Sequence, residues 1–285
     1  VGAFDPSIHK GIGEDWDLLG RRIVDGKIEG DIVAVAQRPG ADILPDVKAD
    51  AQGRVWVAWQ AFQGGLSDIW TAWLDPPSGR WSAPIRVTEG GAGDWEPRLA
   101  FGAAGEALIV YDSCREGNFD VFLARVAPGG EVQTIPAARS KRYEGRAEAA
   151  VGPDGKTLWI AYESGVKNWG KDLGSEWRAT GGGLQYDRRI CLDSIDLASG
   201  ERAFVADITP LIPDLRAVLG QPGSNSVCLP EIEMDERGDV WIFYRYGTDY
   251  WEIALTKYDV QNRQWALPMR LESSGDIVKV VLKDS

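Results

Sequence analysis

Acidic side chains and one tyrosine stand where the apolar segments of this chain begin and end, so they are candidates for acid–base or nucleophilic chemistry. Two carboxyl groups on either side of a glycosidic bond can hydrolyse it, one as acid and the other as base or nucleophile. The chain has 43 Asp and Glu residues, so some such pair is inevitable. We therefore assign no residue a catalytic role and keep four candidates: Asp112, Tyr143, Glu144 and Glu163.

A second group of polar and aromatic residues could bind a polar ligand such as a carbohydrate. Carboxylates accept hydrogen bonds from hydroxyl groups, Arg and Lys donate them, and Trp offers a flat apolar face. The residues expected to bind ligand are Glu96, Arg98, Arg146, Asn168, Trp169, Lys171, Asp172 and Arg245. The plainer alternative for any one of them is a solvated or salt-bridged residue at a strand end.

Composition argues against several kinds of chemistry. His9 is the one histidine, which leaves no histidine-rich metal centre and argues against a Ser-His-Asp relay. The net charge of -12 argues against a nucleic-acid partner, because phosphate binding needs a surplus of Lys and Arg. Cys114, Cys191 and Cys228 are too scattered for a zinc knuckle, while one disulfide plus one free thiol stays open. No apolar run reaches the ~20 residues of a membrane helix. We therefore predict no cofactor, no metal, and neither a nucleic-acid nor a membrane partner.

The elements that must position these residues recur along the chain. The stretch Asp94–Val126 reads as two strands about a turn at Gly105, followed by a polar loop and a third strand. The turn glycines Gly53, Gly105 and Gly155 recur at about 50-residue intervals, and a fourth is Gly238. Short strands repeated at this period predict an all-β fold, a β-propeller of about five four-stranded blades, truncation being an alternative.

We expect residues 1–285 to form a single propeller domain with two loop insertions, 164–189 and 209–228. Long loops inside a compact domain are often functional. Additional strands are predicted near the two ends, at Leu18–Val24 and Ile277–Leu282. They would either close a fifth blade by joining the termini or mark a propeller truncated before its last blades.

The strand pairing predicts where the candidate residues meet. The first and second strands of a blade are antiparallel, so the start of one and the end of the other emerge on the same face. The candidate residues, together with Glu148 and Glu231, are therefore expected to form one polar mouth. Trp56 and Trp159 occupy repeated strand positions typical of a core, whereas Trp169 stands in a loop with no equivalent elsewhere.

Several segments carry a resemblance to a known family: DWEPRLAF (94–101), YDSCREGNFDVFLARV (111–126), YEGRAEAAVGPDGKTLWIAYES (143–164) and NWGKDLG (168–174). The chain resembles, in these segments, the N-terminal propeller-like region of the bacterial domain-of-unknown-function 3604 family. The resemblance implies an extracytoplasmic protein, periplasmic or secreted, whose later part is similar to a PHP-type metal-dependent phosphoesterase. This chain would then be the accessory, substrate-facing part, with a C-terminal hydrolase domain of the same parent protein as its partner. The chain begins at Val1 rather than Met, as expected of a processed or excised piece.

The chain is also similar, more broadly, to sialidase-like propellers of the BNR type, whose repeats carry an Asp-box. Here Ala49 and Ala51 occupy the Ser and Asp positions before Gly53 and Trp56. That resemblance implies an arginine cluster of Arg98, Arg146 and Arg245, with Tyr143 as the nucleophile.

We therefore expect an accessory β-propeller that binds a polar ligand, a glycan for example, at its mouth. One alternative is a glycoside hydrolase or lyase of the sialidase-like propeller type, working at that same mouth. Another is a protein-interaction scaffold, which would use the rim and need no polar cluster.

Overall fold

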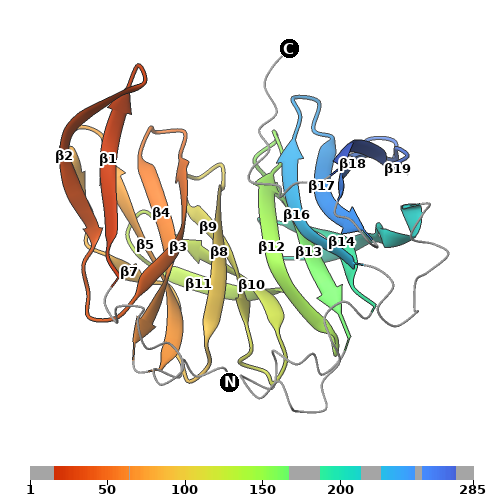
Figure 1. The fold of residues 1–285 in the computed structure, drawn as a ribbon, viewed down its shortest axis with the longest axis horizontal. Helices are drawn as coiled ribbons and strands as arrows, with labels where there is room; N and C mark the ends of the chain where they lie inside the picture. Colours follow the sequence, from red (N-terminus) through yellow and green to blue (C-terminus); the bar gives the residue numbers. More distant parts are fainter. Residues whose placement is uncertain (1–15, 64, 167–186, 213–225, 248–251, 274–285) are drawn as a thin grey trace.

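The computed structural model describes residues 16–63, 65–166, 187–212, 226–247 and 252–273. Their strands form five antiparallel sheets, with one short 3-10 helix, η2 (Thr209–Leu211). The predicted all-β propeller architecture is confirmed (Figure 1). In the part of the chain that the structure describes, no helix is long and apolar enough to span a bilayer.

Four of the sheets are full blades, which we name A to D in chain order, and the fifth is a hairpin. The hairpin consists of β1 (Leu18–Val24) and β2 (Lys27–Ala36). Blade A consists of β3 (Asp42–Ala49), β4 (Val55–Gln63), β5 (Leu66–Asp75), β6 (Arg80–Trp81) and β7 (Ile85–Arg86). Blade B consists of β8 (Asp94–Phe101), β9 (Ala107–Ser113), β10 (Asp120–Val126) and β11 (Val132–Ala138). Blade C consists of β12 (Tyr143–Val151), β13 (Thr157–Gly165), β14 (Arg189–Asp196) and β15 (Arg202–Asp207). Blade D consists of β16 (Ser226–Met234), β17 (Val240–Gly247), β18 (Glu252–Asp259), β19 (Gln264–Trp265) and β20 (Met269–Ser273).

The turn between the first two strands of each blade explains the repeated glycines. Gly53, Gly105, Gly155 and Gly238 all have φ between 66° and 85°, the left-handed region that costs other residues free energy. Each donates its backbone N–H to the carbonyl three residues earlier, at 2.8 to 3.0 Å. These turns fix the register of the hairpins and place the strand ends that carry the polar mouth.

An aspartate and a tryptophan brace this turn in two of the blades. In blade A, Asp50 Oδ2 accepts a 2.9 Å hydrogen bond from the Trp56 indole N–H. In blade D, Asp235 accepts the same bond from Trp241, also at 2.9 Å. The turn aspartate of blade A is therefore Asp50. The Asp-box pattern would place this aspartate one residue later, at Ala51.

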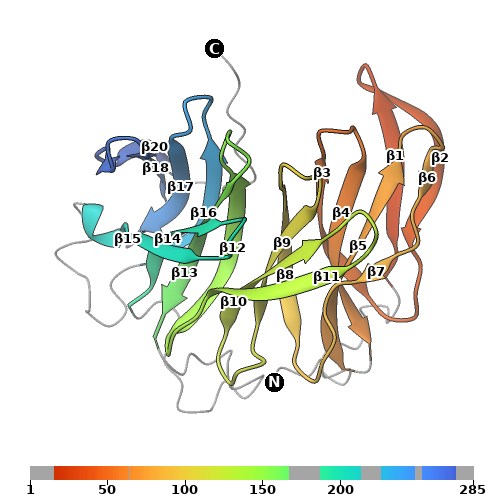
Figure 2. The ribbon, with the colours of Figure 1, turned by 180° about the vertical axis from the view of Figure 1, so that it is seen from behind.

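Apolar clusters between consecutive sheets hold the blades together. Seven consecutive residues of β9 are buried, as expected for a strand covered on both faces. Trp56 packs between blades A and B, Leu123 between B and C, and Trp159 between C and D. Ala36 of β2 joins a further cluster with Trp59, which attaches the hairpin to blade A. The sheets therefore follow one another in chain order, with the hairpin at one end of the row and blade D at the other (Figures 1 and 2).

Some predictions fall on parts of the chain outside the described residues. They include most of the two predicted insertions and the predicted strand Ile277–Leu282. Cys114, Cys191 and Cys228 are all described; they are buried and form no disulfide with one another.

Candidate functional site

The first strand of every blade carries a β-bulge at an equivalent position. The pairing with the second strand shifts register at the same place in β3, β8, β12 and β16. The residue at that point has a left-handed backbone, with φ of 50° to 53°: Leu44, Glu96, Arg146 and Leu229. This conformation costs a non-glycine residue roughly 1–3 kcal/mol and persists only where surrounding contacts impose it. Its recurrence at four equivalent positions marks a built feature of the fold.

Contacts from the preceding blade hold three of these bulges. Gln60 Oε1 accepts the backbone N–H of Glu96 at 3.3 Å. Asp112 Oδ2 accepts that of Arg146 at 2.8 Å, and Glu163 Oε1 accepts that of Leu229 at 2.8 Å. We call this repeated contact the bulge clasp. It locks neighbouring blades in register at the point where the chain enters the lining of a central cavity.

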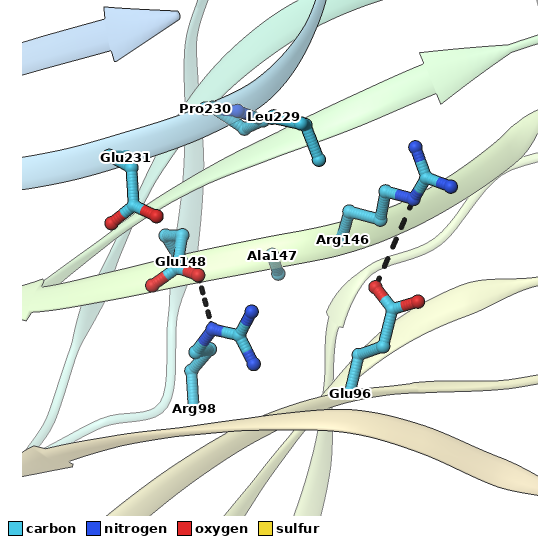
Figure 3. A pocket seen from close by; sticks show the side chains of 8 residues that line it. All are labelled: Glu96, Arg98, Arg146, Ala147, Glu148, Leu229, Pro230 and Glu231. Carbon is cyan, nitrogen blue, oxygen red and sulfur yellow. Dashed lines mark hydrogen bonds and ion pairs between the residues drawn. The ribbon is translucent and has the colours of Figure 1, made fainter. Parts of the chain in front are cut away.

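A cavity of about 180 Å³ lies between the inner strands of blades B, C and D. It is lined by Glu96, Arg98, Arg146, Ala147, Glu148, Leu229, Pro230 and Glu231 (Figure 3). Three of these residues are the bulge residues themselves, and the others lie one or two residues after them in the chain. The bulges therefore determine which side chains reach the cavity, as β-bulges near functional sites often do.

Two arginine–glutamate pairs flank the cavity on either side of Ala147 (Figure 3). On one side, Arg98 on β8 forms an ion pair with Glu148 on β12. On the other, Arg146 Nε lies 3.9 Å from Glu96 Oε2, and its Nη1 lies 3.4 Å from Glu163 Oε1. Both arginines are pre-positioned by carboxylates while keeping polar atoms toward the cavity.

The carboxyl group of Glu148 differs electrostatically from an ordinary surface glutamate. Burial raises its pKa, the nearby Glu231 raises it further, and the adjacent Arg98 opposes the shift. Burial alone would lower the pKa of Arg146, but Glu163, Tyr143 and Glu96 more than compensate and hold it above its usual range. The cavity therefore contains one carboxyl group that resists ionisation and one firmly charged guanidinium.

The four candidate catalytic residues are placed away from solvent. Asp112, Tyr143 and Glu163 are 0% exposed, and Glu144 is 4% exposed. Asp112 and Glu163 make bulge clasps. Burial raises the pKa of Tyr143 well above 10, and Asp112 and Glu163 add to the shift, so its phenol holds its proton firmly.

The fourth candidate, Glu144, is hydrogen-bonded to Ser140 and Asp120. Its carboxylate accepts hydrogen bonds from the Ser140 N–H at 3.1 Å and the Ser140 hydroxyl at 2.5 Å. It is also hydrogen-bonded to the buried Asp120. Burial raises the pKa of Glu144 to about 7 and that of Asp120 to about 6. The two acids form a buried pair between β10 and β12.

The structure brings together three of the eight residues expected to bind ligand. Glu96, Arg98 and Arg146 line the cavity, together with Glu148 and Glu231 of the predicted mouth. Arg245 lies at the end of β17, opposite Cys228, and is not part of the lining. Asn168, Trp169, Lys171 and Asp172 lie outside the described residues.

Sequence reasoning missed the apolar part of the lining, namely Ala147, Leu229 and Pro230. A signal for it exists in hindsight. Proline directly follows the bulge residue in blades A, B and D, as Pro45, Pro97 and Pro230. In the described residues, no group of three or more His, Cys, Asp or Glu side chains could hold a metal ion.

Fold and site together define a β-propeller with a polar central cavity. No family model matches the chain, and neither does any curated protein. Among solved structures, a protein of unknown function from Dyadobacter fermentans DSM 18053 aligns with a TM-score of 0.54 at 12% identity, over 80% of this chain and 68% of that one.

Two polysaccharide lyases share the fold as well. A PL25 ulvan lyase bound to -[GlcA(1-4)Rha3S]- aligns with a TM-score of 0.54 at 10% identity, over 85% of this chain and 57% of the lyase. Polysaccharide lyase Uly1 aligns with a TM-score of 0.51 at 9% identity, over 86% of this chain and 52% of that one. The chain thus matches little more than half the length of these lyases, and at such identities the likeness is one of fold.

Proposed function

We propose that this protein binds one sugar-sized polar ligand, such as a single residue of a glycan, in its central cavity. The observation that carries the proposal is the lining, in which carboxylates and guanidinium groups surround an apolar patch of Ala147, Leu229 and Pro230. A sugar ring has the complementary chemistry, because its hydroxyls both donate and accept hydrogen bonds while its ring C–H groups are apolar. At about 180 Å³ the cavity is smaller than the pockets of about 300–1,000 Å³ that hold drug-sized ligands, which favours one ring over several.

The charge of the cavity lining favours some classes of sugar over others as the ligand. Three glutamates, Glu96, Glu148 and Glu231, face two arginines, Arg98 and Arg146, so the formal charge is -1 when all are ionised and zero when Glu148, whose pKa burial raises, keeps its proton. In either state the lining has no surplus positive charge to offset that of an acidic sugar, and a neutral or amino sugar needs none. The likeness to two polysaccharide lyases supports a carbohydrate as the ligand class, and the lining favours a neutral or amino sugar within it.

Two rival functions have less support. A hydrolase or lyase using Tyr143 and the acids around it would need side chains that reach substrate, and these are buried. A protein-interaction scaffold would not need the charged cavity. Under our proposal the chain is an accessory module of an extracytoplasmic protein.

A glycan array combined with a hydrolysis screen, run with and without divalent metal, separates these functions. We expect binding without turnover. The Glu231→Gln variant should bind about tenfold more weakly or worse, whereas Glu236→Gln, in an exposed turn of blade D, should bind as the unmodified protein does. Turnover of any sugar would favour the enzyme. Neither binding nor turnover in the two assays would favour the scaffold.

A further inference from the structure

The loops that lead into β10 and β12 bring four oxygen atoms around one side-chain nitrogen. Asn118 precedes β10, and its amide Nδ2 lies 2.8 Å from the carbonyl oxygen of Arg142 and 3.3 Å from that of Ser140. The same nitrogen lies 3.2 Å from Asp120 Oδ1 and 3.4 Å from the carbonyl oxygen of Phe119. An amide nitrogen carries two hydrogens, so it can donate well to only two of these four acceptors. We call these four atoms the oxygen ring.

Two buried carboxyl groups, those of Asp120 and Glu144, lie beside the oxygen ring, and we call them the acid pair. They are hydrogen-bonded to each other. Such a bond requires a proton between them, because two ionised carboxylates repel each other. Asp120 is 0% exposed, and its Oδ2 atom has no hydrogen-bond partner among the described residues. A buried oxygen without a donor costs free energy, so the acid pair is a place where a positively charged partner would be stabilised.

The arginines of the same loops are paired with other acids. Arg139 forms an exposed ion pair with Glu116 at 2.8 Å. Arg142 Nη1 lies 2.9 Å from Asp187 Oδ2, which draws its guanidinium group toward the start of β14. In the part of the chain that the structure describes, no Lys or Arg forms an ion pair with either member of the acid pair. The charge of the acid pair is therefore not balanced by these side chains.

A hard divalent cation suits this set of donors. Ca²⁺ takes about six to eight oxygen ligands from carboxylates, backbone and Asn carbonyl groups, and water. The acid pair supplies carboxylates, and the oxygen ring supplies the carbonyl oxygens of Ser140 and Arg142. Asn118 can present its amide oxygen instead of its nitrogen, because rotation of the side chain exchanges the two atoms. Ser140 is exposed, so water can reach the site and complete the set of ligands.

We propose that Ca²⁺ binds between these two loops, held by the carboxylates of Asp120 and Glu144 and by the carbonyl oxygens of Ser140 and Arg142. The ion takes the place of the proton between the two carboxyl groups and ties the start of β10 to the start of β12. None of these residues lines the central cavity, so the inference does not depend on the proposed ligand. The sequence predicts no metal because carbonyl donors leave no trace in residue type.

Calorimetric titration of the intact, chelator-treated chain with CaCl2 at pH 8 tests this site. We expect one ion per chain with a dissociation constant of about 1 mM or lower. Asp120→Asn and Glu144→Gln keep the shape of each side chain but remove its charge, so each should weaken binding about tenfold or more. Glu236→Gln, in an exposed turn of blade D, is the control and should bind Ca²⁺ as the unmodified chain does.

Two further measurements keep the test decisive if one variant folds poorly. Ca²⁺ should raise the melting temperature of the unmodified chain, because a ligand that binds only the folded state stabilises it. Asn118→Asp adds a carboxylate to the site and should bind Ca²⁺ more tightly than the unmodified chain does. No binding at about 10 mM CaCl2 would overturn the proposal. So would weaker binding by Asn118→Asp, or full affinity in both Asp120→Asn and Glu144→Gln, because the ion would then be bound elsewhere.

Discussion

The carboxylate of Glu163, at the end of β13, accepts a 2.8 Å hydrogen bond from the backbone N–H of Leu229, 66 residues later on β16. The same carboxylate lies 3.4 Å from Arg146 and 3.5 Å from Arg188. One buried side chain thus fixes the bulge of the next blade and positions an arginine of the cavity. The packing of the blades and the geometry of the cavity are therefore physically coupled.

Replacing Glu163 with alanine should lower the free energy of unfolding by about 3 kcal/mol, because it leaves a buried N–H and two guanidinium groups without this partner. Urea denaturation measures the change. Glu116→Ala, which breaks an ion pair with Arg139 that is 44% and 48% exposed, should cost less than about 1 kcal/mol. Equal losses of unfolding free energy in the two variants would show that the bulge clasp stabilises the fold no more than an exposed ion pair does.

Gly145 has no room for a side chain. A Cβ atom there would lie 2.5 Å from the Tyr143 hydroxyl and 2.7 Å from Asp112 Oδ2, both on fully buried residues. Gly145→Ala should therefore destabilise the fold by about 1–3 kcal/mol, as overpacking does. Gly91→Ala is the control, since a Cβ there meets nothing within 4 Å and the backbone is not left-handed. Similar melting temperatures for the two variants would contradict this account of the interface between blades B and C.

The buried acid pair predicts a pH dependence of stability. Burial raises the pKa of Glu144 from 4.5 to about 7, so the folded protein binds a proton that the unfolded chain releases between these values. The free energy of unfolding should therefore decrease as pH rises from 5 to 8, and Asp120, with a pKa of about 6, should add to the decrease.

Glu144→Gln tests this assignment, because glutamine cannot ionise. The free energy of unfolding of the variant minus that of the unmodified protein should be more positive at pH 8 than at pH 5. Urea denaturation at pH 5, 6, 7 and 8 gives the comparison, with Glu236→Gln as the exposed control. Parallel pH profiles for Glu144→Gln and the unmodified protein would exclude Glu144 as the source of the slope.

The blade architecture is readable from sequence because it depends on local signals. Turn glycines such as Gly105 mark the hairpins, and apolar runs such as Ala107–Tyr111 mark strands covered on both faces. Leu18–Val24 is a strand with the predicted bounds. These features need no knowledge of which blades are neighbours in space.

The roles of the polar residues are less readable because they depend on neighbouring blades. Asp112 and Glu96 both stand at strand ends, yet one is buried in a bulge clasp and the other lines the cavity. A left-handed backbone at Arg146 is equally invisible, since the residue type does not demand it. The sequence could therefore predict the composition of the mouth, but which residues make bulge clasps and which line the cavity could be seen only in the fold.

Calorimetric titration with a panel of neutral, amino, N-acetylated and uronic monosaccharides tests the central claim most directly. We predict that a neutral or amino sugar binds with 1:1 stoichiometry, and that Glu96→Gln and Glu231→Gln each weaken it about tenfold or more, because hydrogen bonds to charged groups contribute about 1.5–3 kcal/mol. Glu236→Gln should bind as the unmodified protein does. Full affinity in both cavity variants, or no binding by any sugar at millimolar concentration, would contradict a sugar site between blades B, C and D.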